Sequence, residues 1–292
     1  MTVVSTILIT GGDGQLGTAL RETAPDAVRL LTPGRAELDL LRPDSVDAVV
    51  RTARPEIVIN TAAYTDVERA ESEASQAHAV NAEGATAVAA AAARAGARMI
   101  HISTDFVFDG RMSRPYRPTD PTAPLSVYGT SKLAGEHGVT ACSGGRALIV
   151  RTAWLYGTGG TNFVTTMLRR MRAGGVRVVA DQVGSPTWSR SLAAAIWSAV
   201  ERPALCGLHH WADAGVASWY DFAVAIQEEA LALGLLEQPV SIDPIRTEDY
   251  PTQARRPSYS VLDAHETRQA LARPPIHWRT NLRRMLAEAA DG

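Results

Sequence analysis

The chain has almost no lysine: of its 29 Lys and Arg residues, 28 are arginine and only Lys132 is lysine. Lysine carries a compact charge on a flexible stem, whereas arginine carries a planar fork, so the two are not interchangeable at a specific site. A lone lysine in an arginine-rich chain suggests a task that arginine cannot perform. Lys132 is therefore the first candidate for a functional residue.

Cysteine is also scarce, and Cys142 and Cys206 are isolated from each other in the sequence. This pattern builds neither a disulfide framework nor a metal site, and it fits a reducing cytoplasm. The seven histidines have no metal-ligand spacing, so we expect no bound metal. No apolar run approaches the ~18 residues that a membrane span needs. The first ten residues lack the charged region of a signal peptide.

The chain lacks charge of one dominant sign, since its formal net charge is −2 and its arginines are mostly scattered. No basic field is present to bind nucleic acid. Hydrophobic residues make up 46% of the chain and charged residues 21%, which is ordinary for a globular enzyme. At 292 residues the chain can form one large domain or two unequal ones.

Apolar, β-branched segments alternate with helical segments through the first half of the chain. Such alternation predicts a Rossmann-type, doubly wound α/β fold with a parallel sheet covered on both faces. We expect residues 1–152 to form an NAD(P)-binding domain and residues 153–292 mainly a smaller substrate-binding lobe, with some later segments returning to the sheet. The predicted strands are 3–10, 27–31, 57–60, 98–103 and 147–152, and the predicted helices include 43–53, 73–95 and the segment that carries Tyr128.

A glycine-rich turn follows the first predicted strand and precedes a helix. Gly11, Gly14 and Gly17 are spaced three residues apart, with Gln15 and Leu16 between the last two. Small residues let the backbone approach a pyrophosphate, and the helix N-terminus supplies amide donors. The strand–turn–helix context predicts a dinucleotide site rather than a merely structural turn.

The ends of the next strands supply further candidates for cofactor contacts. Arg35 could pair with the 2′-phosphate of NADP, or it could be an ordinary surface arginine. Asp39 and Leu40 could flank the adenine. Small residues after the third strand would let the cofactor lie across the strand ends, and we include Ala62, Ala63 and Tyr64 among its contacts.

Tyr128 and Lys132 are four residues apart, which places both side chains on one face of a helix. An ammonium beside a phenol stabilises the phenolate and lowers its pKa, so the tyrosine could transfer a proton. A half-buried ring beside a solubilising charge has the same spacing. Thr104 and Asp105 end the fourth strand, and their position at the same sheet edge favours catalysis over simple turn chemistry.

These residues together resemble the extended short-chain dehydrogenase/reductase superfamily, and within it the dTDP-4-dehydrorhamnose reductase family. The resemblance covers nearly the whole chain. Its landmarks are the glycine turn, the segments 60–67, 80–81, 103–110, 128–132, 151–154, 162–163 and 181–187, and Arg256-Pro257 with Ser260. The later loops are the more specific part of the pattern.

The resemblance implies a mechanism and a substrate. A reduced nicotinamide, from NADPH or NADH, would deliver hydride to the C4 ketone of a dTDP-linked 6-deoxy-4-keto-L-hexose. Tyr128 would protonate the oxygen, Lys132 would bind the nicotinamide ribose, and Thr104 would join the relay. Further implied contacts to the sugar nucleotide are Asp105, Trp154, Asn162, Gln182 and Arg256.

Two departures from the family pattern and three alternatives remain. Phe106 stands where tyrosine is frequent, and Gln15 and Arg190 stand where some members hold a bridging magnesium, so we expect a monomer or weak homodimer. The same chemistry could serve an antibiotic sugar, as in dihydrostreptose formation. A non-catalytic regulatory subunit on this fold is disfavoured by the intact Thr104, Tyr128 and Lys132. A dehydratase or epimerase is disfavoured because Phe106, not an acid, follows Asp105.

Overall fold

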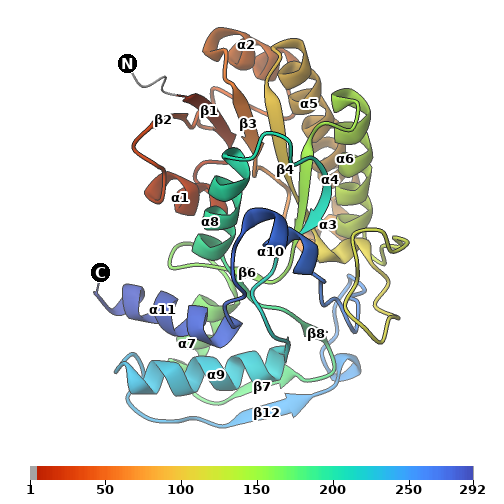
Figure 1. Cartoon of the computed structure of the whole chain (residues 1–292). Helices are drawn as coiled ribbons and strands as arrows, with labels where there is room; N and C mark the ends of the chain where they lie inside the picture. The colour runs from red at the N-terminus through yellow and green to blue at the C-terminus, as the bar shows by residue number, and fades with distance from the viewer. Residues whose placement is uncertain (1–4, 292) are drawn as a thin grey trace.

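A sheet of six parallel strands forms the centre of the computed structural model, which describes residues 5–291 (Figure 1). The strand order is β10-β5-β4-β3-β1-β2. The predicted strands are present, although residues 3 and 4 of the first lie outside the described residues. The strands are β1 (Ser5–Thr10), β2 (Val28–Leu31), β3 (Ile57–Asn60), β4 (Arg98–Thr104), β5 (Leu148–Thr152) and β10 (Gly207–His210).

Alternate side chains of β1 pack into two different cores, which explains its unbroken apolar run. Ile7 and Ile9 join a cluster with helices α1 (Gln15–Glu22) and α8 (Ser189–Val200). Leu8 points to the opposite face, where it packs with α2 (Pro43–Ala53), α5 (Ala85–Arg94) and α6 (Val127–Ser143). Both faces of the sheet are therefore covered by helices, as the α/β prediction requires (Figure 1).

The strand order reverses beside β1, which lies between β2 and β3. In open parallel sheets, ligands bind at such a switch point, just beyond the carboxyl ends of the strands. The glycine turn follows β1 there, and the segment 61–64 follows the adjacent β3. The topology therefore brings two predicted parts of the cofactor site together.

The predicted helix over residues 73–95 is wrong in detail, because that segment is interrupted. α3 (Val67–Ser72) and α4 (Ala74–His78) precede a π-helical turn over Ala79–Gly84, and α5 follows. The Asn81 amide explains the interruption: it bonds Tyr64 N at 2.8 Å, Tyr64 O at 3.0 Å and Ser131 Oγ at 3.0 Å. These bonds tie the loop after β3 to α6 through the widened turn.

A second hydrophobic core lies below the sheet in Figure 1. It is built by α7 (Phe163–Ala173), α9 (Trp219–Ala232) and α11 (Trp278–Asp291), with β7 (Val176–Val179) paired in parallel to β12 (Ile242–Ile245). β10 and α8, although late in the chain, belong to the sheet layer. The division into a cofactor domain and a substrate lobe stays a prediction.

Short elements connect the two cores. β6 (Leu155–Tyr156) pairs in parallel with β9 (Thr187–Trp188), and β11 (Ala217–Ser218) pairs antiparallel with β8 (Val183–Gly184). The remaining short elements are α10 (His265–Leu271) and 3₁₀ turns at Asp105–Val107 and Thr247–Asp249.

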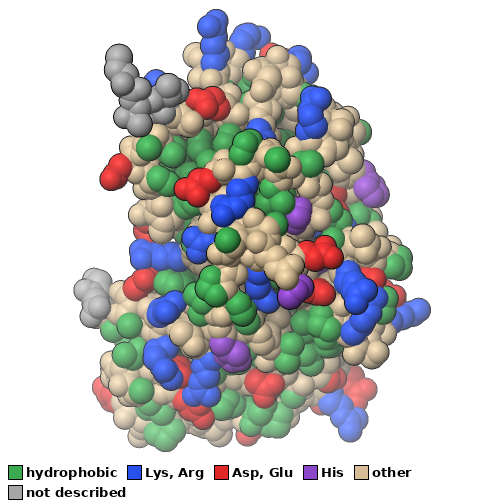
Figure 2. Space-filling model, in the orientation of Figure 1, with side chains coloured by type: hydrophobic (Ala, Val, Ile, Leu, Met, Phe, Trp, Pro, Cys, Tyr) green, Lys and Arg blue, Asp and Glu red, His purple; other side chains and the backbone are tan. Residues whose placement is uncertain are grey.

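Acidic and basic side chains are intermixed on the face that Figure 2 shows, with no field of one sign. This arrangement agrees with the small net charge of the sequence. Among residues 5–291, no helix is both long enough and apolar enough to cross a bilayer.

Candidate active site

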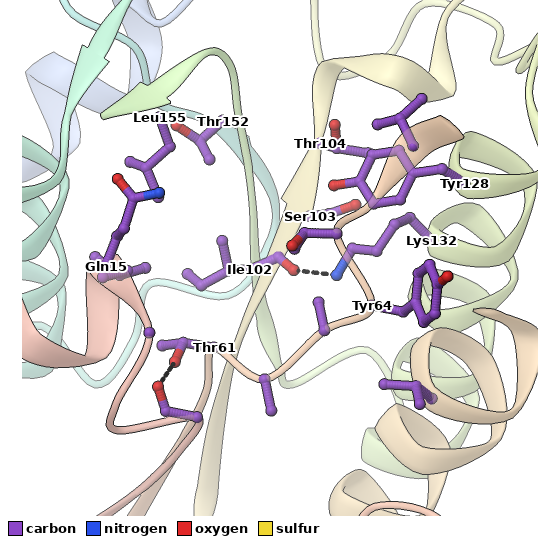
Figure 3. Close-up of a pocket in the computed structure, with 18 of the residues that line it drawn as sticks. Gln15, Thr61, Tyr64, Ile102, Ser103, Thr104, Tyr128, Lys132, Thr152 and Leu155 are labelled. Atoms are coloured by element: carbon purple, nitrogen blue, oxygen red, sulfur yellow. Dashed lines mark hydrogen bonds between the residues drawn. The ribbon is translucent and has the colours of Figure 1, made fainter. Parts of the chain in front are cut away.

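A cavity of about 730 Å³ lies beyond the carboxyl ends of β1, β3, β4 and β5. Its volume lies within the range of ligand-binding clefts. Figure 3 shows Tyr128 and Lys132 facing Gln15 and Leu155 across it. The predicted residues in its wall are Gly11, Gly14, Gln15, Leu16, Arg35, Asp39, Leu40, Ala62, Ala63, Tyr64, Thr104, Asp105, Tyr128, Lys132, Trp154, Asn162 and Arg256.

The glycine turn forms a tight cradle at one end of this cavity. Gly11 has φ +72°, and a Cβ there would lie 2.7 Å from the Ala62 backbone. A Cβ on Gly17 would lie 2.2 Å from Gly11 O, so Gly17 acts through packing and does not line the cavity. Gly14 is the N-cap residue of α1 and provides no side-chain cap. The amide donors at this helix end therefore remain available to a pyrophosphate, and the turn fits a dinucleotide.

The adenosine end of the cavity is bordered by Pro33, Arg35, Leu38, Asp39 and Leu40. Arg35 is exposed and forms no ion pair with another described residue. The Asp39 carboxylate already has a partner nearby in the chain, since its Oδ1 accepts a hydrogen bond from Leu41 N at 3.1 Å. An available guanidinium at this position suits a 2′-phosphate.

Helix α6 brings Tyr128 and Lys132 to the end of β4. Ser126 caps the helix by accepting a hydrogen bond from Gly129 N at 3.1 Å. Gly129 permits close approach, because a Cβ there would lie 2.2 Å from Phe106 O. The Phe106 ring meets the Tyr128 ring edge-on at 5.7 Å, so phenylalanine packs here without needing a hydroxyl. Both predicted catalytic side chains enter the cavity from one helix face (Figure 3).

Burial shifts the pKa of both side chains of the pair. Burial raises the pKa of Tyr128 to about 12, while the Thr104 hydroxyl lowers it and Asp105 raises it. Lys132 Nζ donates to Ile102 O at 2.7 Å, so the ammonium is bonded to β4. Burial dominates the shift of Tyr128 and no contribution from Lys132 enters it, so the lowering of the tyrosine pKa by Lys132 stays a prediction. Tyr128 is held protonated at neutral pH, as a proton donor must be.

Asp105 is buried beside this pair, and its Oδ1 accepts a hydrogen bond from Thr104 Oγ1 at 3.1 Å. Its Oδ2 is buried without a hydrogen-bond partner among the described residues. Burial raises the pKa of Asp105 to about 6, and hydrogen bonds from Ser260 and Thr104 oppose that rise. A buried carboxylate oxygen in a cavity wall suits a hydroxyl-bearing ligand.

Two stacked indoles form the wall on the side of the second core. Trp154 and Trp219 lie 3.5 Å apart between ring centroids at an interplanar angle of 2°. Trp154 has φ +47°, a left-handed conformation that directs its ring over Gly184. Trp219, which is not among the predicted contacts, also lines the cavity. The Ser218–Asp221 capping box is a sequence signal that places Trp219 in the first turn of a helix.

Gln182 does not line the cavity, in contrast to its predicted role as a direct contact. Its Oε1 accepts a hydrogen bond from Trp219 Nε1 at 3.2 Å, and its Nε2 donates to Thr247 Oγ1 at 3.1 Å. Gln182 thus supports the indole that does reach the cavity.

Asn162 and Arg256 reach the cavity while making other contacts. Asn162 caps α7 through Thr165 N at 3.1 Å and also donates to Gly157 O at 2.9 Å. Arg256 donates to Glu68 Oε1 at 2.7 Å. Both side chains are therefore held in place by the protein before any ligand contact.

Comparison with known proteins gives consistent results. The family model of the RmlD substrate binding domain matches residues 5–290. The chain is 40% identical over 291 residues to a dTDP-4-dehydrorhamnose reductase of Aggregatibacter actinomycetemcomitans, covering 97% of this chain and 99% of the relative. It is 42% identical to one of Mycobacterium tuberculosis strain CDC 1551, covering 98% and 93%.

A solved structure shares the same architecture. The dTDP-4-dehydrorhamnose reductase of Bacillus anthracis, crystallised in complex with NADP, superposes with a TM-score of 0.91 at 36% identity. The match covers 97% of this chain and 99% of that one.

Proposed function

Because the chain belongs to the family of the RmlD substrate binding domain, we propose that it is an NAD(P)H-dependent oxidoreductase. It reduces the C4 ketone of a dTDP-linked 6-deoxy-4-keto-L-hexose. The observation that carries this proposal is the meeting of Tyr128, Lys132 and Thr104 in the wall of a cavity whose other end fits a dinucleotide. The sequences of the named reductases, about 40% identical over nearly the full chain, support the same activity.

The residues divide the reaction between them. The reduced cofactor supplies the hydride that C4 of the sugar receives. Tyr128 donates its phenolic proton to the ketone oxygen as negative charge develops there. The Thr104 hydroxyl helps to orient the phenol of Tyr128. The Lys132 ammonium binds the nicotinamide ribose and stabilises the negative charge of the phenolate. The ketone thus gains one hydride and one proton and becomes a secondary alcohol.

The rest of the cavity suits the sugar nucleotide. Trp154 and Trp219 give the sugar an apolar wall, and Asp105 offers a buried acceptor to its hydroxyls. Arg256 and Asn162 are placed to bind the nucleotide or its pyrophosphate, with Gln182 acting through Trp219. We propose dTDP-4-dehydro-L-rhamnose as the substrate and dTDP-L-rhamnose as the product, because the relatives bear the name of that reaction.

We also propose that the enzyme acts in the cytoplasm as a monomer or weak homodimer. Arg190 forms ion pairs within the chain, to Glu22 Oε2 and Glu288 Oε1, both at 2.9 Å. A cation held in this way opposes a bridging metal ion at the same place.

Purified protein given NADPH and dTDP-4-dehydro-L-rhamnose tests the activity directly. We expect oxidation of the reduced cofactor in proportion to product. The 4-keto precursor of dihydrostreptose is given to the protein in the same assay. A higher kcat/KM for this precursor than for dTDP-4-dehydro-L-rhamnose would support the antibiotic-sugar alternative. Oxidation with neither sugar would support the non-catalytic alternative and would contradict the proposal.

Arg35→Ala tests the assigned 2′-phosphate contact. A charge-assisted hydrogen bond contributes roughly 1.5–3 kcal/mol, so we expect the KM for NADPH to rise by about 10- to 100-fold. The KM for NADH should be nearly unchanged, because NADH has no phosphate at this position. Equal changes in the KM for NADPH and the KM for NADH would show that Arg35 does not bind the 2′-phosphate.

A further inference from the structure

The active-site helix carries a third buried polar side chain, Glu136, one turn beyond Lys132. Tyr128, Lys132 and Glu136 are four residues apart in turn, so all three lie along one face of α6. Lys132 is 3% exposed and Glu136 is 4% exposed. A buried carboxylate needs partners that compensate its charge.

Each of three successive residues of β4 is matched with one of these three side chains. Ile102 O accepts a hydrogen bond from Lys132 Nζ at 2.7 Å. Ser103 Oγ donates to Glu136 Oε1 at 2.5 Å. Thr104 and Tyr128 lie together in the cavity wall (Figure 3), where the Thr104 hydroxyl lowers the pKa of the phenol. The carboxyl end of β4 therefore holds Tyr128, Lys132 and Glu136 in one arrangement.

Arg151, on the neighbouring strand β5, holds the Glu136 carboxylate from its other side. Its Nε donates to Oε1 at 2.8 Å and its Nη2 donates to Oε2 at 2.6 Å, which is a bidentate pair. The Arg151 guanidinium also lies over the Phe108 ring, 5.0 Å from its centre. Glu136 is thus oriented by two strands, and neither it nor Arg151 lines the cavity.

We propose that Glu136 is a positioning residue of this active site, whose buried carboxylate keeps the Lys132 ammonium charged while Arg151 and Ser103 hold that carboxylate in place. Its importance for turnover rests on the proposed function. Its effect on Lys132 does not, because that effect is a property of the protein alone.

The electrostatics of Lys132 support this role. Burial lowers the pKa of Lys132 to about 8, and the charge of Glu136 opposes that fall. Without the carboxylate, burial would lower the pKa of Lys132 further, and the ammonium would lose its proton nearer neutral pH. The other titratable or charged groups on the elements packed near Lys132 are Tyr128 on α6, His101 and Asp105 on or after β4, Arg151 on β5 and Tyr64 after β3.

The single lysine makes the proposal directly measurable. Protein grown with ¹³C-labelled lysine has one labelled side chain, so the NMR signal of its ε-carbon reports Lys132 alone. We expect the wild-type titration midpoint near pH 8. In Glu136→Gln the midpoint should fall by about one pH unit, which means a roughly tenfold lower affinity of Lys132 for its proton.

Glu229→Gln is a matched control for the loss of a buried carboxylate. Glu229 is 3% exposed and binds Arg279 and Arg283, between α9 and α11. Its removal should lower stability as the Glu136 change does, yet it should leave the Lys132 midpoint at its wild-type value.

A double variant covers the case in which Glu136→Gln alone does not fold. Glu136→Gln with Arg151→Gln leaves no unpaired buried charge, and the two amides can bond to each other. Its Lys132 midpoint should also fall, but by less than in the single variant, because the positive charge of Arg151 is removed together with the negative charge of Glu136. If either folded variant kept the wild-type midpoint, Glu136 would be only a structural clamp and the proposal would be wrong.

Activity provides the second readout. The alkaline limit of kcat should move to lower pH in the Glu136 variant by the same amount as the NMR midpoint, with the control unchanged. If the wild-type enzyme turned over no 4-keto sugar, the proposed function would fail, but the titration would still decide the effect of Glu136 on Lys132. If the NMR midpoint fell while the alkaline limit of kcat did not move, the claim that Glu136 matters for turnover would be wrong.

Discussion

Tyr128→Phe should lower kcat by about 10³-fold, the scale of a lost general acid, while leaving the Kd for NADPH nearly unchanged. The change removes the only proton donor that we assign to the ketone oxygen. It also keeps the ring that packs edge-on against Phe106, so the cavity should keep its shape. Single-turnover kinetics and a cofactor titration measure the two quantities separately.

Tyr156→Phe is the control for this experiment. Tyr156 is fully buried, lies outside the cavity wall, and its hydroxyl makes a long 3.4 Å hydrogen bond to Trp278 O. Its loss should leave kcat near the wild-type value. A fully active Tyr128→Phe enzyme would show that another group protonates the substrate.

Lys132→Arg should lower kcat by about 100-fold or more, although the charge is kept. The ammonium is buried and donates to Ile102 O, and a planar guanidinium cannot occupy the same space. Displacement of the charge would also disturb Glu136 on the next turn. We expect a raised KM for the cofactor together with the lower kcat, both measured from steady-state kinetics.

Lys132→Met completes the comparison, because methionine is similar in length but has no charge. If charge alone mattered, the arginine enzyme would stay active and only the methionine enzyme would fail. We expect both to fail. An arginine enzyme that kept most of its activity would contradict the role that we assign to the lone lysine.

The sheet and the cofactor cradle could be predicted because their signals are local. Ile7, Leu8 and Ile9 are a continuous apolar run, which is typical of a strand buried on both faces. The spacing of Gly11, Gly14 and Gly17 reflects backbone contacts that any Cβ would obstruct. The four-residue spacing of Tyr128 and Lys132 similarly places them on one helical face.

Other features depend on contacts between distant segments, which periodicity does not reveal. The π-helical turn exists because Asn81 bonds the loop after β3 and helix α6, and the alanine-rich sequence alone favours an unbroken helix. Trp219 reaches the cavity because it stacks on Trp154, 65 positions away in the sequence. The Glu136–Arg151 pair is equally nonlocal, and so is the burial that raises the pKa of Tyr128.

Transfer of a labelled hydride tests the central claim most directly. NADPH carrying deuterium at the transferred position is incubated with the protein and dTDP-4-dehydro-L-rhamnose, and the product is analysed by mass spectrometry and NMR. The account predicts dTDP-L-rhamnose with one deuterium, located at C4. Product without deuterium at C4, or no reduced sugar at all, would contradict it.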